Sequence, residues 1–414
     1  MAREKKSSED PLAEKVPGVT GNEEPQNNTR PVKESAKKGM KISFTVDTGL
    51  FQKALSFVKE TVKRGNTLPV LDNCLCSIEM GDKLKIRTTD LEVDTSILIP
   101  IESVKGTLDE FLFDCHGVDK IVQLCDANIL EINFMDGDMV ITEGFNTYKF
   151  NGNPDPDEFP RPADLGEEDQ NVTIPFKDLA SHMKDAIGFC GVDEIRLVLT
   201  GIFMEGDGET VGITSTDAHK LFHFDLPCKS DTFSVIMPQK FVTRLLDVAK
   251  SEEEISISIL NKGTNILFKT DKYIVSGRLI EGKYPNWRAV CPTDNPFMVT
   301  WNRKELSTNI KKLNAIDGGS TNQVRVCFKN GETTFNRMNM DKGTSGVITM
   351  KHTEEGEYED EDKCIGFNSM FLYKGVSVMS EENIKCKMSK PNKAAVLGED
   401  MHYFILLMPV MLNK

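Results

Sequence analysis

The chain has 414 residues, with 39% hydrophobic and 28% charged residues and a formal net charge of −14. This is the composition of a soluble globular protein with room for two to four domains. No apolar run approaches the roughly 20 residues that span a bilayer. The start of the chain has neither the apolar core of a signal peptide nor the acid-poor composition of a transit peptide. The negative balance argues against wrapping of nucleic acid over the whole surface, but it leaves room for a local basic surface.

The N-terminal stretch and the first predicted helix differ sharply in composition. Residues 1–39 are rich in Lys, Glu, Ser, Asn and Pro, and we expect a disordered extension there. Structure is predicted to begin at Met40 with the strand KISFTV, followed by a helix whose apolar residues recur from Phe51 to Val62 at helical spacing. The opposite face of that helix is basic, with Lys53, Lys59 and Lys63, and with Arg64 just beyond. A single basic face is usually only a solvated surface, so its recurrence matters.

The ten cysteines are scattered through the chain without any C-x-x-C pair. This distribution predicts reduced thiols in a cytosolic protein. Cys74 and Cys76 lie two residues apart in a strand-like run, so they share one face of the strand. We interpret them as packed core residues rather than as a redox or metal pair.

A strand followed by a helix opens three similar units. In ISFTVDTGLFQKAL, VTIPFKDLASHMKDAI and MVTWNRKELSTNIKKL, the equivalent leucines are Leu50, Leu179 and Leu306, at nearly equal intervals. A repeat of this length predicts three similar domains rather than a solenoid of short repeats. A second helix is expected in each unit, near residues 116–125, 238–250 and 367–379. We therefore predict an α+β fold, with an antiparallel sheet and two helices per domain, over residues 40–165, 166–295 and 296–414.

A second pair of landmarks supports this duplication. A Thr-Asp pair follows a strand at Thr89-Asp90 and again at Thr216-Asp217, and each pair is followed at nearly the same interval by an aromatic residue and proline, Phe159-Pro160 and Tyr284-Pro285. The second of these lies in GRLIEGKYPNWRAVCP, which we expect to leave a strand as a rigid extended arm. Such an arm is either a packed seam between domains or one wall of a site.

Edge-to-edge joining of these domains would remove exposed strand edges and place the helices on one side. Lysines on the helices would then gather on an inner surface, while carboxylates dominate outside, as in HTEEGEYEDEDK. Such a surface suits a polyanion that is held through its phosphates without regard to sequence. The candidate inner-surface residues are Lys53, Lys59, Lys63, Arg64, Lys240, Arg244, Lys304 and Lys311.

Over residues 40–414 the chain resembles the bacterial-type DNA sliding clamp, the β subunit of DNA polymerase III. The matching stretches are TLPVLDNCL with TTDLEVD, DEFP, STDAHKL, VIMPQK, LIEGKYPNWRAVCP and the terminal LLMPVML. The resemblance implies the DNA clamp fold, with two chains of three domains closing a ring around duplex DNA. It implies a cytoplasmic processivity factor of DNA replication that is not an enzyme and needs no cofactor or metal. The implied partners are a second copy of the chain, double-stranded DNA, the replicative polymerase, the clamp loader, and repair or ligation proteins with linear clamp-binding motifs.

The resemblance also implies a hydrophobic cleft between the second and third domains that captures partner peptides. Methionine side chains and a proline-fixed rim suit a pocket that accepts different peptides. The first helix of the second domain should add a side chain, at His182 or Met183. The carried-over cleft residues are Thr216, Ala218, His219, Lys220, Leu221, Pro285, Ala289, Val290, Met408, Pro409, Val410, Met411 and Leu412.

Several positions depart from the family pattern. The family usually has glycine at Ala218 and arginine at Lys220, Ala289 and Met411, and it tends to end at the leucine matching Leu412. These changes put the peptide preference in question, though not the pocket. Together with the N-terminal extension, the divergence suggests a phage-encoded or otherwise atypical clamp.

Two other functions compete with the clamp. Asp217 and His219, two residues apart after a strand, are of the types used for acid-base or metal chemistry, but no third ligand, nucleophile or phosphate-binding loop lies at a recognisable spacing. We therefore expect Asp217 to bond turn backbone groups and His219 to line a groove. The other alternative is a monomeric peptide-binding scaffold of clamp-like fold that does not encircle DNA.

Overall fold

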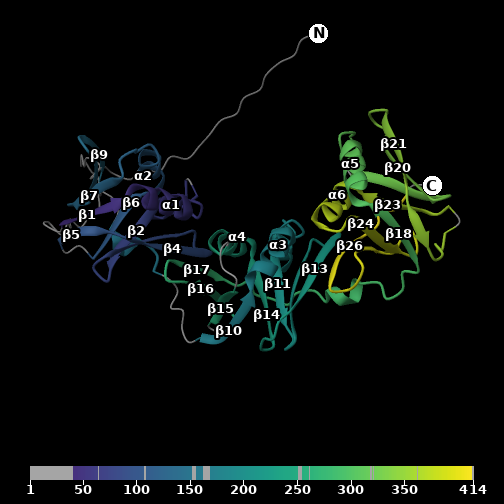
Figure 1. Ribbon diagram of the computed structural model, residues 1–414, viewed down its shortest axis with the longest axis horizontal. Coiled ribbons are helices and arrows are strands. Elements are labelled where there is room, and N and C mark those ends of the chain that lie inside the picture. The colour runs from purple at the N-terminus through teal and green to yellow at the C-terminus, as the bar shows by residue number, and fades with distance from the viewer. Residues whose placement is uncertain are drawn as a thin grey trace, which may run out of the picture. The chain divides into compact units, whose positions relative to one another are not determined.

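The computed structural model describes residues 41–63, 65–106, 109–151, 155–161, 168–249, 254–260, 262–317, 319, 321–360 and 362–412 (Figure 1). The predicted extension at residues 1–39 and the candidate residue Arg64 lie outside these ranges. Among the described residues, no helix has both the length and the apolar character needed to cross a membrane.

The order of helices and strands repeats three times along the chain. The first repeat contains β1 (Lys41–Asp47), α1 (Thr48–Lys59), β2 (Asn73–Glu79), β3 (Lys83–Thr89), β4 (Val93–Pro100), β5 (Glu102–Gly106), β6 (Glu110–Asp114), α2 (Cys115–Val122), β7 (Ile129–Met135), β8 (Asp138–Glu143) and β9 (Asn146–Phe150). The second contains β10 (Glu168–Pro175), α3 (Phe176–Ile187), β11 (Gly201–Gly206), β12 (Thr210–Thr216), β13 (Lys220–Pro227), β14 (Phe233–Pro238), α4 (Gln239–Val248), β15 (Glu254–Leu260), β16 (Asn265–Lys269) and β17 (Tyr273–Arg278).

The third repeat contains β18 (Phe297–Asn302), α5 (Arg303–Asn314), β19 (Gln323–Lys329), β20 (Glu332–Asn339), β21 (Thr344–Lys351), β22 (Thr353–Glu355), β23 (Cys364–Asn368), α6 (Ser369–Val378), β24 (Asn383–Met388), β25 (Ala395–Leu397) and β26 (Tyr403–Leu407). Short 3₁₀ helices are η1 (Pro69–Asp72), η2 (Pro156–Glu158), η3 (Glu194–Thr200) and η4 (Trp287–Val290). The predicted α+β class, with antiparallel strands and two helices per repeat, is confirmed. The domain boundaries proposed above remain a prediction.

The first helix of each repeat begins where the sequence predicts. The Asp47 carboxylate accepts a hydrogen bond from Leu50 N at 2.8 Å, and Asn302 caps α5 in the same way through Glu305 N. These side chains bond amides that have no partner within the helix. Pro175 occupies the cap position of α3 and provides no such bond. The apolar face of α1 is fully enclosed, with Phe51, Ala54, Leu55 and Val58 at most 1% exposed.

Strand pairing joins the repeats into common sheets. β17 of the second repeat pairs antiparallel with β4 of the first, and β26 of the third pairs in the same way with β13 of the second. The resulting sheets have the orders β10-β15-β16-β17-β4-β3-β2-β6 and β14-β11-β12-β13-β26-β25-β24-β18-β22. The predicted edge-to-edge joining is confirmed.

Two strands that correspond to these joining strands have no such partner in the described part of the chain. β9 ends the order β5-β1-β7-β8-β9, as β17 ends the matching part of the second repeat, but it pairs only with β8. β21 occupies the place of β4 and β13, but it pairs only with β20. Both strands therefore present an open edge.

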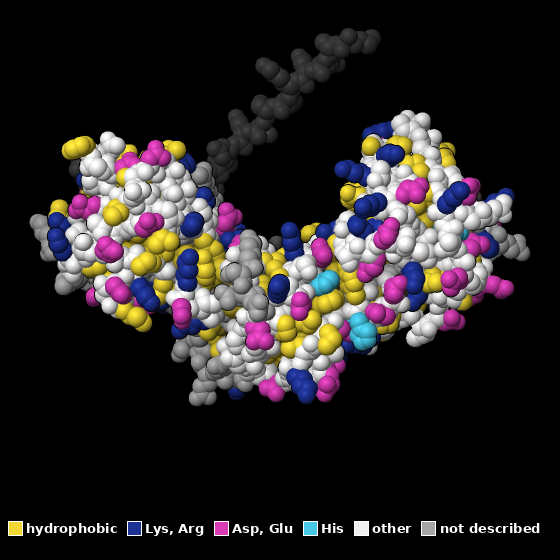
Figure 2. All heavy atoms as spheres, in the orientation of Figure 1, with side chains coloured by type: hydrophobic (Ala, Val, Ile, Leu, Met, Phe, Trp, Pro, Cys, Tyr) yellow, Lys and Arg dark blue, Asp and Glu magenta, His cyan; other side chains and the backbone are white. Residues whose placement is uncertain are grey.

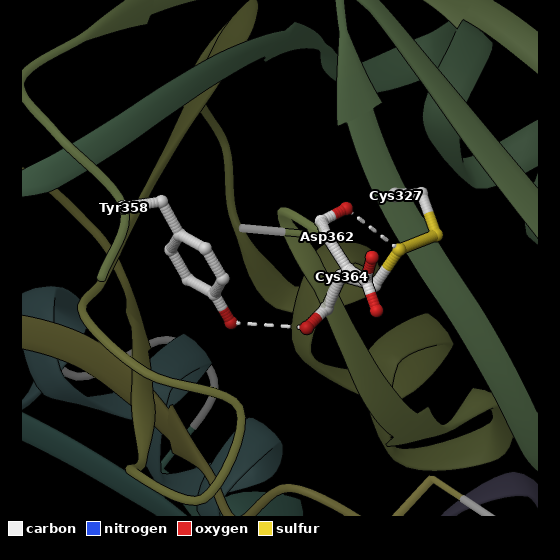
Figure 3. Close-up of a disulfide and its surroundings, with 4 residues drawn as sticks. All are labelled: Cys327, Tyr358, Asp362 and Cys364. Atoms are coloured by element: carbon white, nitrogen blue, oxygen red, sulfur yellow. Dashed lines mark hydrogen bonds between the residues drawn. A yellow bond between two sulfur atoms is a disulfide. The ribbon is translucent and has the colours of Figure 1, made fainter. Parts of the chain in front are cut away.

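The thiols correct one expectation from the sequence. Cys74 and Cys76 are free and fully buried, as predicted. Cys327 and Cys364, however, form a disulfide between β19 and β23 (Figure 3). The prediction that all thiols are reduced is therefore wrong for this pair. The sequence could not reveal it, because the two residues are 37 positions apart and meet only through the register of neighbouring strands.

We predict that replacing Asp47 with alanine lowers the free energy of unfolding by about 1 kcal/mol, since α1 loses its N-cap. Asp47→Asn, which keeps the accepting oxygen, should remain close to the parent. Thermal unfolding of both variants provides the measurement. Equal losses for alanine and asparagine would contradict the capping role.

Candidate functional site

A rigid turn links β12 to β13. The Asp217 carboxylate accepts hydrogen bonds from the backbone amides of His219 and Lys220 at 2.8 and 2.9 Å. Thr216 Oγ1 donates to the Lys220 carbonyl at 2.7 Å and accepts from Ala218 N at 3.0 Å. Ala218 has a φ of 76°, in the left-handed region that favours glycine. Asp217 thus serves the turn, as expected, and its hydrogen bonds give no support to an acid-base pair with His219.

The same turn recurs in the first repeat. Asp90 accepts from the amides of Glu92 and Val93, Thr89 bonds the Val93 carbonyl, and Leu91 takes a φ of 72°. This matching geometry supports the duplication inferred from the Thr-Asp pairs. The two turns differ in the cation that reaches the aspartate.

In the second repeat the cation comes from the turn itself. Lys220 Nζ lies 2.5 Å from Asp217 Oδ2, and the residue is only 7% exposed. Its ammonium also lies over the rings of Phe189 and Phe371, 5.6 and 5.0 Å from their centroids. Lys220 therefore bridges the turn to α6 of the third repeat through charge and ring contacts.

The C-terminal segment runs from this turn to the third repeat. Met408 N donates to the His219 carbonyl at 2.9 Å, and Val410 N donates to the Gly366 carbonyl at 2.8 Å. Gln323 Nε2 donates to the Met411 carbonyl at 2.8 Å. The backbone is thus held along its length, while the side chains of Met408 and Met411 are 38% and 69% exposed.

An apolar cluster lies beside the turn and the C-terminal segment. It contains Leu199, Leu221, Ile236, Tyr284, Trp287, Ala394, Val396, Phe404 and Leu406. Trp287 is fixed by its indole N–H, which donates to Glu205, and by Arg288 over its ring. Pro285, Ala289 and Val290, on the same arm as Trp287, are exposed. Figure 2 shows hydrophobic side chains reaching the surface over β11 to β14.

The structure corrects the predicted contribution of α3. Met183 is fully buried in the core of the second repeat, and the His182 ring stacks on Phe224 with 3.7 Å between centroids. Burial lowers the pKa of His182. Neither residue belongs to the apolar cluster, whereas Leu199 of η3 does. The repeat itself held a signal for this residue, because Val198-Leu199 precedes β11 as Val70-Leu71 precedes β2.

The candidate cationic residues fall into two groups. Lys59 pairs with Asp119 at 2.7 Å, Lys63 lies 4.0 Å from Asp90, and Arg244 pairs with Asp247 at 2.9 Å. Lys53 on α1 and Lys304 and Lys311 on α5 are exposed. Among the described ion pairs, none involves these three lysines.

Lys240 is the most constrained of the candidates. Its ammonium contacts Asp90 at 2.7 Å and also pairs with Glu92, so α4 of the second repeat is tied to the Thr-Asp turn of the first. Burial raises the pKa of Asp90, but the hydrogen bonds from Lys240 and from turn amides outweigh it and hold the pKa below its usual value. A cavity of about 220 Å³ at this junction is lined by Glu60, Thr61, Lys63, Asp90, Val93, Gln239, Lys240, Thr243 and Arg244.

Comparison with known proteins places these features in one family. Models of the DNA polymerase III beta subunit match residues 42–162 (N-terminal domain), 179–286 (central domain) and 288–410 (C-terminal domain). The beta sliding clamp of Pseudomonas aeruginosa is 23% identical over 359 residues, covering 86% of this chain and 95% of that protein. That of Caulobacter vibrioides is 24% identical over 347 residues, covering 80% and 89%.

Solved structures show the same fold. The Pseudomonas aeruginosa sliding clamp bound to griselimycin has a TM-score of 0.82 at 22% identity and covers 90% of this chain and all of that one. The beta subunit from Thermotoga maritima has a TM-score of 0.81 at 19% identity, with the same coverage. Because the three domain models match in order across the chain, it belongs to the DNA polymerase III beta subunit family, the bacterial-type DNA sliding clamps.

Proposed function

We propose that this clamp closes a ring around duplex DNA as a homodimer and acts there as a processivity factor, without catalysis, in the bacterial cytoplasm. The carrying observation is the strand pairing between repeats, β4 with β17 and β13 with β26, which leaves the corresponding β21 and β9 with open edges. Pairing of β21 with β9 of a second copy would use the same type of join, and two such contacts close a ring.

Exposed apolar side chains accompany both open edges. Met338, Met340 and Val347, on or beside β20 and β21, are 53%, 79% and 60% exposed, and Phe145, next to β9, is fully exposed. Uncovered edges with apolar neighbours favour association with another chain. A monomeric scaffold would leave these edges and side chains in water, so the dimer is the better account.

For the DNA-facing surface, we propose that Lys53, Lys304 and Lys311 make the main phosphate contacts. Lys59, Lys240 and Arg244 are engaged with carboxylates, so a phosphate would have to compete for them. Lys63 lies at the outer distance of an ion pair and is exposed. A few free cations suffice if the ring itself prevents escape, and weak contacts allow sliding.

For partner capture, we propose the predicted cleft walls, extended by Leu199. The turn Thr216–Leu221, the arm with Pro285, Ala289 and Val290, and the segment Met408–Leu412 surround an apolar surface suited to linear motifs. The bound partners would be the replicative polymerase, the clamp loader, and repair or ligation proteins. Exposed methionines allow one surface to fit several peptides.

The junction between the first two repeats explains why one cleft is favoured. At the positions of Thr214 and Leu221, the first repeat has Arg87 and Asp94, which pair at 2.5 and 3.0 Å. Arg87 also donates to the Pro160 carbonyl and lies over the Phe159 ring. A buried ion pair therefore occupies the place where the second junction is apolar. An apolar peptide would find only the second junction open among these two.

We expect a solution mass of about twice 46.3 kDa and retention on circular, but not linear, DNA after loading. Val347→Asp should shift the protein towards monomer, because it places a charge on the open edge of β21. Met80→Asp is the control, since Met80 is 86% exposed but lies on the β2–β3 turn. Analytical ultracentrifugation measures the mass. A monomeric parent, or equal release from circular and linear DNA, would reject the ring.

The two groups of lysines can be separated by mutation. The Lys304→Ala, Lys311→Ala double variant should weaken DNA binding and reduce the salt slope of log K by up to about 2, one for each lost phosphate contact. Lys240→Ala should leave the slope nearly unchanged but lower the melting temperature, because Asp90 loses its partner. Salt titrations and calorimetry provide the readouts. The reverse pattern would show that Lys240 contacts DNA.

The cleft assignment predicts a selective loss of peptide binding. Met408→Ala with Leu412→Ala should weaken a fluorescent clamp-binding peptide about tenfold or more without dissociating the dimer, because two apolar contacts are removed. Met401→Ala is the matched control, because Met401 is 46% exposed outside the cleft. Fluorescence anisotropy measures the affinity. Parent-like affinity in the double variant would overturn the assignment.

A further inference from the structure

The disulfide of the third repeat lies at a mechanically important place. Cys327 on β19 and Cys364 on β23 are direct register partners (Figure 3). Tyr358 donates a hydrogen bond to the Cys364 carbonyl at 3.2 Å, and the Asp362 carbonyl oxygen lies 3.1 Å from Cys364 Sγ. In the described sheet order β21-β20-β19-β23, β23 is an edge strand whose only partner strand is β19.

Both joined strands hold the C-terminal wall of the proposed cleft. Gly366, two residues after Cys364 on β23 and therefore on the same face, accepts the hydrogen bond from Val410 N. A Cβ atom at Gly366 would lie 2.9 Å from Leu412 Cδ2, so Leu412 rests directly on this position. Gln323 on β19 holds the Met411 carbonyl. The disulfide thus secures the edge strand on which Leu412 lies.

The bond also closes a long loop. The two cysteines are 37 residues apart, and the segment between them contains β20, β21 and β22. A link of this kind limits the conformations open to the chain and stabilises the strands at its base. Without it, β23 would depend on its hydrogen bonds to β19 and on side-chain packing. Edge strands held in this way open locally more readily than central ones.

We propose that Cys327–Cys364 is a redox-active site for a dithiol reductant, and that its reduction loosens β23 and weakens peptide capture by the C-terminal wall. This proposal rests on the proposed cleft for its consequence, but not for its chemistry. Cys327 is half-buried whereas Cys364 is 5% exposed, so attack occurs at Cys327 Sγ. The free Cys74, Cys76 and Cys386 are fully enclosed, and burial raises the pKa of each thiol.

The reaction is a balanced thiol–disulfide exchange. A thiolate of the reductant attacks Cys327 Sγ, the bond between the cysteines breaks, and Cys364 leaves as a thiolate that takes up a proton. The second thiol of the reductant then attacks the mixed disulfide, gives up its proton and releases Cys327 as a thiol. Two electrons pass to the protein pair, and the reductant becomes a disulfide.

The test uses the full chain, oxidised or treated with dithiothreitol, and alkylation read by mass spectrometry. We expect Cys327 and Cys364 to be alkylated only after reduction. Reduction should then raise the Kd of a fluorescent clamp-binding peptide at least threefold, and it should speed hydrogen exchange of residues 364–368 and 408–412. The Cys327→Ser, Cys364→Ser double variant should behave like the reduced parent in either condition. Cys228→Ser, which removes a half-buried free thiol, should keep the parent's response.

The possible failures are distinguishable. Alkylation of both cysteines without reductant, or unchanged hydrogen exchange after reduction, would overturn the redox proposal whatever the peptide does. Equal peptide Kd in both redox states would overturn the link to the cleft while leaving the clamp function intact. Absence of peptide binding in both states, combined with faster exchange at 408–412, would reject the cleft but support the redox-sensitive strand.

Discussion

The structure depends on backbone hydrogen bonding between strands of different repeats. β4 with β17, and β13 with β26, convert separate units into common sheets. A strand edge in water has unpaired amides and carbonyls, and pairing with the next repeat satisfies them while fixing the register between units. Because register fixes which side chains meet, this pairing places Leu221 opposite Leu406 at one junction and Asp94 opposite Ser276 at the other.

Duplication of one scaffold followed by divergence accounts for the different junctions. The Thr-Asp turn keeps its backbone geometry in both copies, but the cation that reaches the aspartate is Lys220 from the turn itself in one and Lys240 from the neighbouring repeat in the other. The first arrangement leaves the junction beside it apolar. The second ties two repeats together, while the Arg87–Asp94 pair fills the equivalent groove. One scaffold thus yields a junction suited to binding and a junction that is closed.

The charge distribution fits a protein that holds DNA by enclosure rather than by strong attraction. Net charge is strongly negative, and several helix lysines are already paired with carboxylates. The unpaired lysines identified lie on α1 and α5, in the outer repeats rather than the central one. Strong phosphate binding along the whole surface would oppose movement along the duplex, whereas a few exchangeable contacts permit it.

The sequence by itself determined the three units, the apolar faces of their helices, the Thr-Asp turns and the family, because these follow from local periodicity and from motifs that keep their order and spacing. Tertiary structure alone decided the pairing of Lys240 with Asp90, the disulfide between Cys327 and Cys364, and the replacement of His182 or Met183 by Leu199 beside the cleft. Each of these joins residues from elements distant in the chain, and only strand register and packing bring them together. A pattern within one segment contains no information about the segment it will face.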